Sequence, residues 1–267
     1  MKRIALLLFV AAGIACVHPA AAQFRIGGKK INAAKALQAG AEVVKAVSLS
    51  DDDIVRMSRE AVEWMDAHNP IADETTPYGE RLKRLTENVR VEGLDLNFKV
   101  YHVVDVNAFA CGDGSIRVFS SLMDLMTDDE LMAIIGHEIG HVVHADVKAA
   151  MKNAYLSSAA RNAAGAVEGS TLAKLSDSEL GELTTAFTGA QFSQKQENAA
   201  DDYGLEFCVK NGVDPYAMAN SLNRLVELSG GEKASVVQKM FSSHPDSEKR
   251  AARMKAKADA LQQGAQQ

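Results

Sequence analysis

One helical run, residues 130–144, constrains this chain more than any other feature. It reads Glu-Leu-Met-Ala-Ile-Ile-Gly-His-Glu-Ile-Gly-His-Val-Val-His. On a helix, His137 and His141 share one face and can bind one metal ion through their imidazoles. Glu138 lies beside them, where a general base is needed next to a metal. The pattern is typical of a zinc-dependent protease; the alternative is a buried helix with incidental histidines.

Two glycines, Gly136 and Gly140, lie inside the same predicted helix. Each costs up to about 1 kcal/mol in a helix interior relative to alanine. Their presence beside two histidines and a glutamate does not suit an ordinary core helix. We therefore expect another backbone to pack closely against this helix.

A catalytic zinc ion takes three protein ligands and keeps a further position open. The best candidate for the third ligand is Glu197, on a second predicted helix that must fold back across the first. Asp201 shares a face with Glu197 and is then placed to contact a ligand histidine and fix its orientation. The alternative for these acidic residues is a solvated helix face.

Three ordered motifs carry a resemblance to a known family. They are His137-Glu138-x-x-His141, Glu197-x-x-x-Asp201 and His244-Pro245-x-x-x-x-Arg250. Together they resemble the zinc metallopeptidase family of HtpX and the CAAX prenyl endopeptidases, in its soluble periplasmic LoiP/BepA-like branch. The resemblance runs from about residue 75 to 255.

The resemblance implies a gluzincin with one zinc ion per chain, held by His137, His141 and Glu197. It implies that Glu138 activates water for peptide hydrolysis. The fold that it implies is a mainly helical, α+β, zincin-like domain with a small β-sheet beside the metal helix.

The resemblance also carries over His244 and Arg250 as residues near the metal. His244 is the first candidate to stabilise the oxyanion of the tetrahedral intermediate. Alternatively it fills the open position on zinc in a resting, latent state, or it simply belongs to a turn. Arg250 is expected to be a structural anchor.

The first residues predict a secretory signal peptide over 1–22. Lys2 and Arg3 precede an apolar stretch from Ile4 to Cys16, which is too short to span a bilayer, and cleavage is expected after Ala22. We therefore expect a periplasmic or secreted protein. The alternative is a lipoprotein anchored through Cys16.

Charge and cysteine content narrow the function further. The net charge is −6, so the chain has no electrostatic footprint for nucleic acid. No later stretch is apolar enough to predict a transmembrane helix. Cys111 and Cys208 would remain after cleavage, and in an oxidising compartment they are candidates for a disulfide; the alternative is two buried thiols.

The rest of the chain predicts a domain order and a set of elements. The predicted parts are a signal peptide (1–22), an N-terminal helical segment (23–72), a zinc metallopeptidase domain (73–262) and a frayed tail (263–267). The expected helices are 30–47, a helix capped by Ser50, 78–89, 215–229 and 246–262. The expected strands are 96–101 and 116–119, with a turn at Gly112–Gly114 between them. Residues 153–190 are a connecting helical hairpin or a lid.

Two functions remain open. The first is an endopeptidase of the cell envelope that acts on unfolded or misfolded proteins, a role implied only by the resemblance. The second is a zinc-stabilised chaperone-like or binding module with little proteolysis. The intact Glu138 favours the first, because a scaffold has no use for a carboxylate beside an open metal position.

Overall fold

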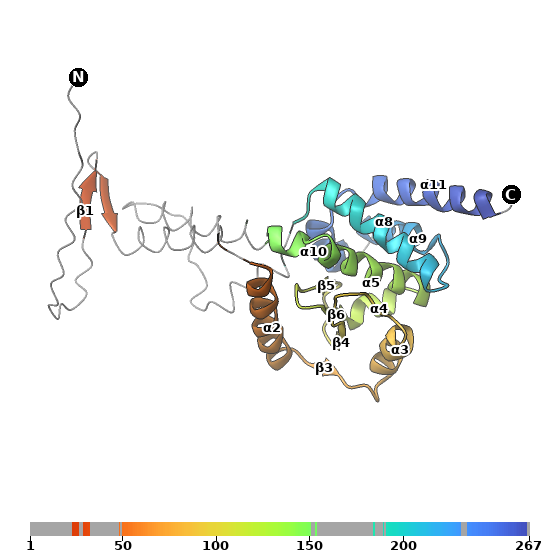
Figure 1. Ribbon diagram of the computed structural model, residues 1–267, viewed down its shortest axis with the longest axis horizontal. Coiled ribbons are helices and arrows are strands. Elements are labelled where there is room, and N and C mark those ends of the chain that lie inside the picture. Colours follow the sequence, from red (N-terminus) through yellow and green to blue (C-terminus); the bar gives the residue numbers. More distant parts are fainter. Residues whose placement is uncertain are drawn as a thin grey trace, which may run out of the picture.

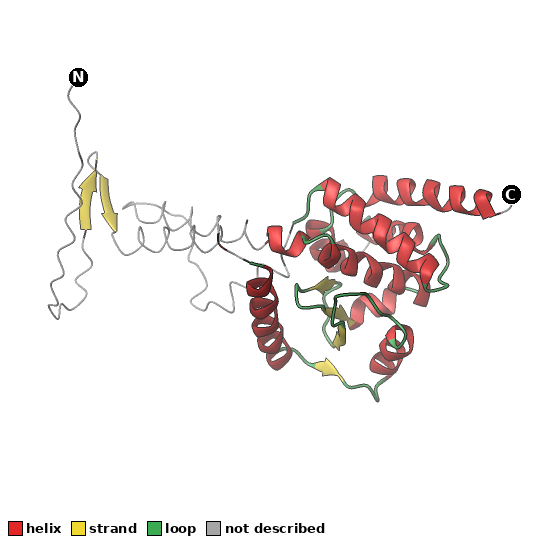
Figure 2. Ribbon diagram, in the orientation of Figure 1, coloured by secondary structure: helices red, strands yellow, loops and turns green. Residues whose placement is uncertain are grey.

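The computed structural model describes residues 23–26, 29–32, 48, 50–150, 153, 184, 189, 191–230 and 234–265 (Figure 1). The predicted signal peptide with Cys16, most of the predicted helix over 30–47 and nearly all of the segment 153–190 lie outside the described residues. The described part is mainly helical, with one small mixed sheet (Figure 2), which confirms the predicted fold class.

Two short strands near the N-terminus correct one prediction. β1 (Gln23–Ile26) and β2 (Lys29–Asn32) pair antiparallel, so the helix predicted from residue 30 is wrong over residues 30–32. The sequence between the strands is Gly27-Gly28, a pair that favours a two-residue hairpin turn. This local signal outweighs the loose apolar spacing that predicted a helix.

Helix α2 (Asp51–His68) begins at the predicted cap, where Ser50 and Asp53 form a capping box. Its buried face repeats at helical spacing through Ile54, Met57, Ala61 and Met65. This apolar stripe packs against one face of the sheet.

The sheet has four strands in the order β3-β4-β6-β5. Their bounds are β3 (Ile71–Ala72), β4 (Asn97–Tyr101), β5 (Ala108–Ala110) and β6 (Ser115–Phe119). The two predicted strands are β4 and β6, and they pair in parallel. The turn at Gly112–Gly114 therefore joins β5 to β6, with Gly114 at a φ of 91° that favours glycine.

The sheet is covered on both faces. Val100, Ala108 and Val118 face a cluster that includes residues of α3 (Pro77–Thr86), α4 (Ser120–Leu125) and α5 (Asp128–Val143). The alternate residues, such as Tyr101 and Phe109, face α2. This alternation follows from the pleat of the strands and separates the metal helix α5 from α2.

Helix α5 packs most extensively against α8 (Gln194–Lys210), which folds back across it as predicted. A Cβ at Gly140 would come within 3.1 Å of the Cα of Ala200, so the expected close backbone approach occurs there. Gly136 instead faces the ring of Phe207, which a Cβ would meet at 2.6 Å. The two glycines thus let α8 lie close enough to bring its acidic residues to the histidines.

Three further helices close the body beside α8. They are α9 (Ala217–Ser229), α10 (Ala234–Ser243) and α11 (Ser247–Ala265). The sequence predicts α9 and α11, but not α10. Helix α11 also continues to Ala265, so residues 263–265, predicted to be frayed, are helical.

A buried ion pair ties α2 to the sheet. Arg117 on β6 donates to both carboxylate oxygens of Asp66 on α2, at 2.8 and 3.0 Å, and its side chain is only 1% exposed. Tyr101 and Lys99 each donate to Asp66 at 2.7 Å. Helix α2 precedes the predicted domain start at 73, yet it provides the counter-charge for an arginine in the sheet.

The two cysteines do not form the predicted disulfide. Cys111 and Cys208 are both free and buried. Cys111 packs with residues of α2, whereas Cys208 packs with residues of α9 and α11. Sequence separation carries no information about which side of α5 a cysteine occupies. Burial raises the pKa of both thiols, that of Cys208 to about 12.

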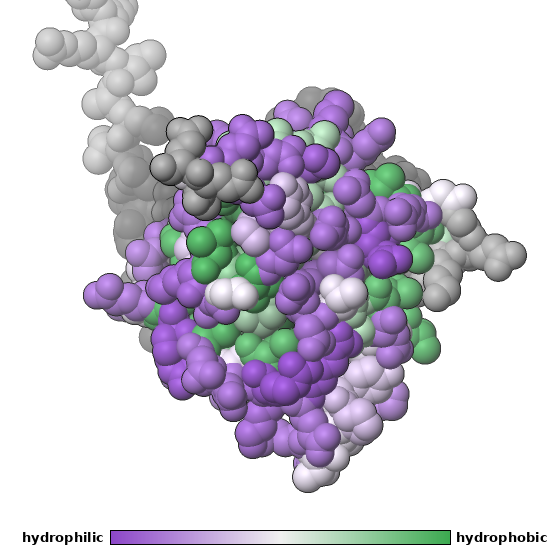
Figure 3. Space-filling model, turned by 90° about the vertical axis from the view of Figure 1, so that its right-hand side faces the viewer, coloured by the Kyte–Doolittle hydropathy of each residue, from purple (hydrophilic) through white to green (hydrophobic). Residues whose placement is uncertain are grey.

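The surface of the body is mixed. Seen from the side on which α11 ends, it is mainly hydrophilic, with smaller apolar areas between the polar ones (Figure 3). Among the described residues, no helix has the length and apolar content needed to cross a bilayer.

Candidate metal centre

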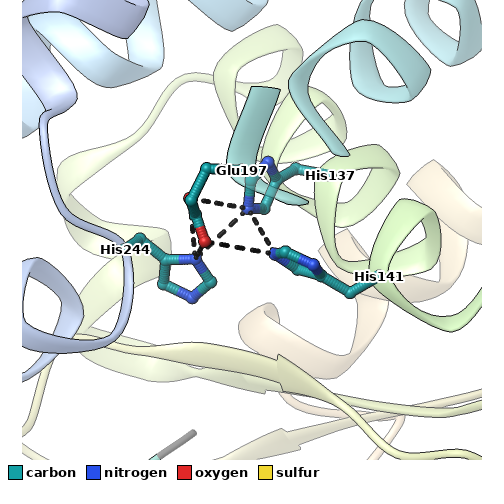
Figure 4. Close-up of side chains that lie close together, drawn as sticks. All are labelled: His137, His141, Glu197 and His244. Atoms are coloured by element: carbon teal, nitrogen blue, oxygen red, sulfur yellow. Dashed lines mark hydrogen bonds and ion pairs between the residues drawn. The ribbon is translucent and has the colours of Figure 1, made fainter. Parts of the chain in front are cut away.

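Four buried side chains from three parts of the chain converge beside α5 (Figure 4). His137 and His141 come from α5, Glu197 from the first turn of α8, and His244 from the link between α10 and α11. One ligand atom from each lies within 4.8 Å of all the others. The cluster therefore holds the three predicted ligands together with His244, for which a place at the open metal position was one of the predicted alternatives.

The hydrogen bonds around the histidines fit a cation at the centre of this cluster. The Nδ1 atoms of His137 and His141 bond to Asp201 at 3.0 Å and to Asp146 at 2.9 Å. A neutral imidazole that donates through Nδ1 has only a lone pair at Nε2. The two Nε2 atoms lie 3.1 Å apart, so either a proton or a metal ion must lie between them.

His244 completes the polar shell of the same centre. Its Nδ1 lies 3.2 Å from Nε2 of His137 and 3.1 Å from Oε1 of Glu197. Two or three imidazole nitrogens with a carboxylate oxygen form a donor set that suits zinc. The residues present therefore fit the predicted metal.

Arg250 anchors the carboxylates behind the cluster. It donates to both oxygens of Asp201, at 2.9 and 2.6 Å, and pairs with Glu197 at 2.5 Å. Burial alone would raise the pKa of Asp201, but Arg250 and His137 lower it to about 2. Burial opposes ionisation of Glu197 as well, yet the surrounding histidines hold its pKa far below the usual range. Both carboxylates are thus ionised at neutral pH.

The two histidines of α5 differ in their affinity for protons. Burial lowers the pKa of His137 below its ordinary value in spite of the bond to Asp201. Burial also acts to lower the pKa of His141, but bonds to Asp146 and Glu197 outweigh it and raise the pKa to about 9. A metal must therefore displace a proton from His141 at neutral pH, so metal affinity rises with pH.

Asp146 is the site residue that sequence reasoning missed. Helix α5 ends at Val143, and Ala145 adopts a left-handed φ of 58°, after which Asp146 lies within bonding distance of His141. Gln196 on α8 donates to the other oxygen of Asp146 at 2.8 Å. Each histidine of α5 thus has its own orienting carboxylate, one from α8 and one from the chain just beyond α5.

Replacing Asp146 with asparagine should weaken metal binding about 10–100-fold, because the His141 ring loses its orienting anion. The measurement is a competition titration of the metal-loaded protein with a chelator. Asp202→Asn is the matched control, since Asp202 is next to Asp201 but pairs with Arg253 and Lys257 away from the metal. Equal affinities for the two variants would contradict the role given to Asp146.

Phe192, just before α8, packs over the rings of the cluster. Its ring stacks on His141 with centroids 3.9 Å apart and planes 17° apart, and it lies 5.8 Å from the ring of His244. His141 is therefore fixed at Nδ1 by Asp146 and on one face by an aromatic ring. No sequence motif marks this residue.

Glu138 is buried next to the cluster but is not one of its members. Its Oε1 atom makes no hydrogen bond and lies 3.6 Å from Nε2 of His244. A buried acceptor without a donor is costly and calls for a functional reason. The predicted base thus stands beside the metal ligands, with His244 between it and them.

The outer edge of β5 presents unpaired backbone groups near this site. The N–H of Phe119 donates to the carbonyl of Asn107 at 3.0 Å, and that of Cys111 donates to Ser115 at 2.8 Å. In this antiparallel pattern Ala108 and Ala110 point their N–H and C=O groups away from β6. No strand of the described residues pairs with that edge.

Comparison with known proteins identifies the family. Residues 75–258 match the family model for Peptidase family M48. The chain is 41% identical to Metalloprotease LoiP of Escherichia coli K12 over 217 residues, which cover 80% of this chain and 84% of the relative. It is 36% identical to Metalloprotease YcaL of the same strain, over 81% of this chain and 84% of the relative. A beta-barrel assembly-enhancing protease of Yersinia pestis is 29% identical over 74% of this chain and 42% of the relative. Together with the cluster of metal-binding side chains on α5 and α8, these matches show that the chain is a metallopeptidase and belongs to peptidase family M48.

Proposed function

We propose that the protein is a zinc-dependent endopeptidase of the cell envelope that cleaves unfolded or misfolded polypeptides. The observation that carries this proposal is the buried carboxylate of Glu138, whose Oε1 atom makes no hydrogen bond, beside the four-residue ligand cluster. A metal site that served only to stabilise the fold would not need such a group. The envelope location rests on the predicted signal peptide and on the resemblance of the three motifs to the soluble periplasmic branch of the family.

The chain's own residues supply most of the chemistry. Zinc, one per chain, held by His137, His141 and Glu197, would polarise the scissile carbonyl and acidify water. Glu138 takes the proton from the attacking water and delivers it to the leaving amine. Asp201 and Asp146 hold the two imidazoles through Nδ1, which leaves both Nε2 atoms directed into the cluster.

Substrate recognition at the edge of β5 would favour unfolded polypeptides as substrates. An extended peptide can add to the outer edge of this strand through the backbone groups of Ala108 and Ala110. Main-chain bonding of this kind depends little on sequence, but it requires that the substrate segment be extended and free of its own structure. Folded proteins would be excluded and misfolded ones accepted.

In this proposal, the conformation with His244 in the cluster is a resting, inactive state of the enzyme. The Nδ1 atom of His244 approaches His137 while its Nε2 faces Glu138, so the ring occupies the space between Glu138 and the other residues of the cluster. Substrate and water need that space. The side chain must leave before hydrolysis begins, which gives low basal activity and accounts for the alternative of a chaperone-like module.

Replacing His244 with alanine should therefore raise the rate of casein cleavage about tenfold. In the wild type only the molecules whose His244 ring has left the cluster can cleave substrate, whereas in the variant no ring has to leave. The measurement is the release of fluorescent fragments from labelled casein at equal zinc content. A fall in rate would instead assign His244 to oxyanion stabilisation.

Zinc content and casein cleavage of the wild-type chain test the proposal as a whole. We expect one zinc per chain and slow cleavage that a chelator stops and added zinc restores. Zinc-loaded protein that cleaves nothing, both as wild type and as His244→Ala, would favour the binding module. Absence of any bound metal would overturn both functions.

A further inference from the structure

A small cavity opens directly behind the metal cluster. Its apolar wall is formed by Ile134 of α5, by Met218, Leu222 and Leu225 of α9, and by Met240 of α10. Two members of the metal cluster, His137 and His244, form another part of its wall. His137 and His244 thus border both this cavity and the metal cluster.

The polar groups in the wall are already bonded within the protein. Arg250 is committed to Asp201 and Glu197. The hydroxyl of Ser221 donates to the carbonyl of Met218 at 2.9 Å, and that of Ser247 donates to the carbonyl of His244 at 3.4 Å. A polar side chain that entered would lose its water and find few partners, whereas an apolar one would gain contacts.

The cavity is narrow while His244 stays in the cluster. About 20 Å³ of it is open to the centre of a water molecule, which is room for one or two waters. Its walls can give way, because Met218 and Met240 are unbranched and adapt to what they contact. Departure of His244, one of its lining residues, would also enlarge the cavity on the side of the metal cluster.

We propose that this cavity is the specificity pocket of the enzyme and that it receives an aliphatic side chain, such as leucine or methionine, from a residue flanking the scissile bond. The inference rests on the proposed peptidase function and deepens it. The β5 edge reads the backbone of any extended segment, and the cavity then selects where along that segment the bond is cut. Acidic and basic side chains are rejected at this position.

Leu222 is the residue to change, because its truncation enlarges the pocket without touching a metal ligand. The variant Leu222→Ala should raise the cleavage of sites with phenylalanine relative to sites with leucine about tenfold, as expected when a pocket gains several methyl-sized spaces. Cleavage sites in unfolded casein are mapped by mass spectrometry. Leu205→Ala is the matched control: Leu205 packs in the same apolar cluster as Leu222 but does not line the cavity. If Leu222→Ala does not fold, the milder Leu222→Val takes its place.

A binding measurement decides the proposal without hydrolysis. Zinc-loaded Glu138→Gln protein is titrated calorimetrically with acetylated, amidated Ala-Ala-Xaa-Ala-Ala peptides that carry leucine or aspartate at Xaa. The leucine peptide should bind about tenfold more tightly or better, and Leu222→Ala in the same background should reduce that ratio.

The two proposals fail in different ways. Cleavage of casein with no apolar preference at either flanking position, or an equal effect of Leu222→Ala and Leu205→Ala, would overturn the pocket and leave the peptidase intact. Absence of cleavage by both the zinc-loaded wild type and its His244→Ala variant would reject the peptidase function. In that case equal binding of the leucine and aspartate peptides would reject the pocket too, and selective binding of leucine would retain it as a binding site.

Discussion

Glu138→Gln protein should hydrolyse casein about 10³-fold more slowly than the wild type while it keeps its metal. Glutamine preserves the shape of the side chain but cannot accept the proton of the attacking water. The metal should stay because Glu138 is not among the four converging ligands. The measurements are fragment release and metal content by mass spectrometry on the same sample.

Glu206→Gln provides the matched control for this substitution. This substitution makes the same chemical change, but Glu206 lies on the exposed side of α8. The rate of casein cleavage should therefore be unaffected. Substantial activity in the Glu138 variant would mean that another group removes the proton. Loss of metal from it would mean that Glu138 supports the ligands and that the activity measurement says nothing about a base.

Asp66→Ala should lower the free energy of unfolding by about 3–5 kcal/mol, because it leaves the buried guanidinium of Arg117 without its counter-charge. Lys99→Ala removes another partner of the same carboxylate, but the side chain of Lys99 is 38% exposed. Its loss should cost about 1 kcal/mol or less. Both free energies are measured by urea unfolding followed by circular dichroism. A larger loss of stability for Lys99→Ala than for Asp66→Ala would contradict the conclusion that the Arg117 pair is the stronger of the two.

The same ion pair sets a dependence on pH. Burial acts to raise the pKa of Asp66, but the bonds from Arg117, Lys99 and Tyr101 outweigh it and hold the pKa below the ordinary value of 3.8. The stabilisation is therefore complete above that value and is lost as the pH falls through the lower pKa of the folded state. The stability difference between wild type and Asp66→Asn should shrink in acid.

Helical spacing explains why much of the site was predictable. His137 and His141, and likewise Glu197 and Asp201, are four residues apart, and on a helix that separation fixes a common face. The glycine at 140 indicated in addition that a second helix comes close, and Ala200 of α8 does. Only His244 and Arg250 needed the resemblance to a family.

Asp146 and Phe192 were missed because their contacts with His141 do not follow from a regular separation along the sequence. Asp146 lies near His141 because the chain leaves its helix through a left-handed residue, and no simple periodicity relates positions five apart. Phe192 reaches the same histidine from the start of another helix. The prediction of a disulfide failed for a similar reason. The sequence does not distinguish two cysteines in separate apolar clusters from two that are close in space.

Arg250, near the end of the chain, joins both carboxylates of α8 to the last helix. The centre therefore spans more than a hundred residues, and a chain that stops before residue 244 lacks both His244 and this clamp. Because synthesis runs from the N-terminus, the HExxH helix is made long before its partners arrive. The arginine clamp on Glu197 and Asp201 thus forms only after residue 250 has been made, and until then these two carboxylates lack their buried counter-charge.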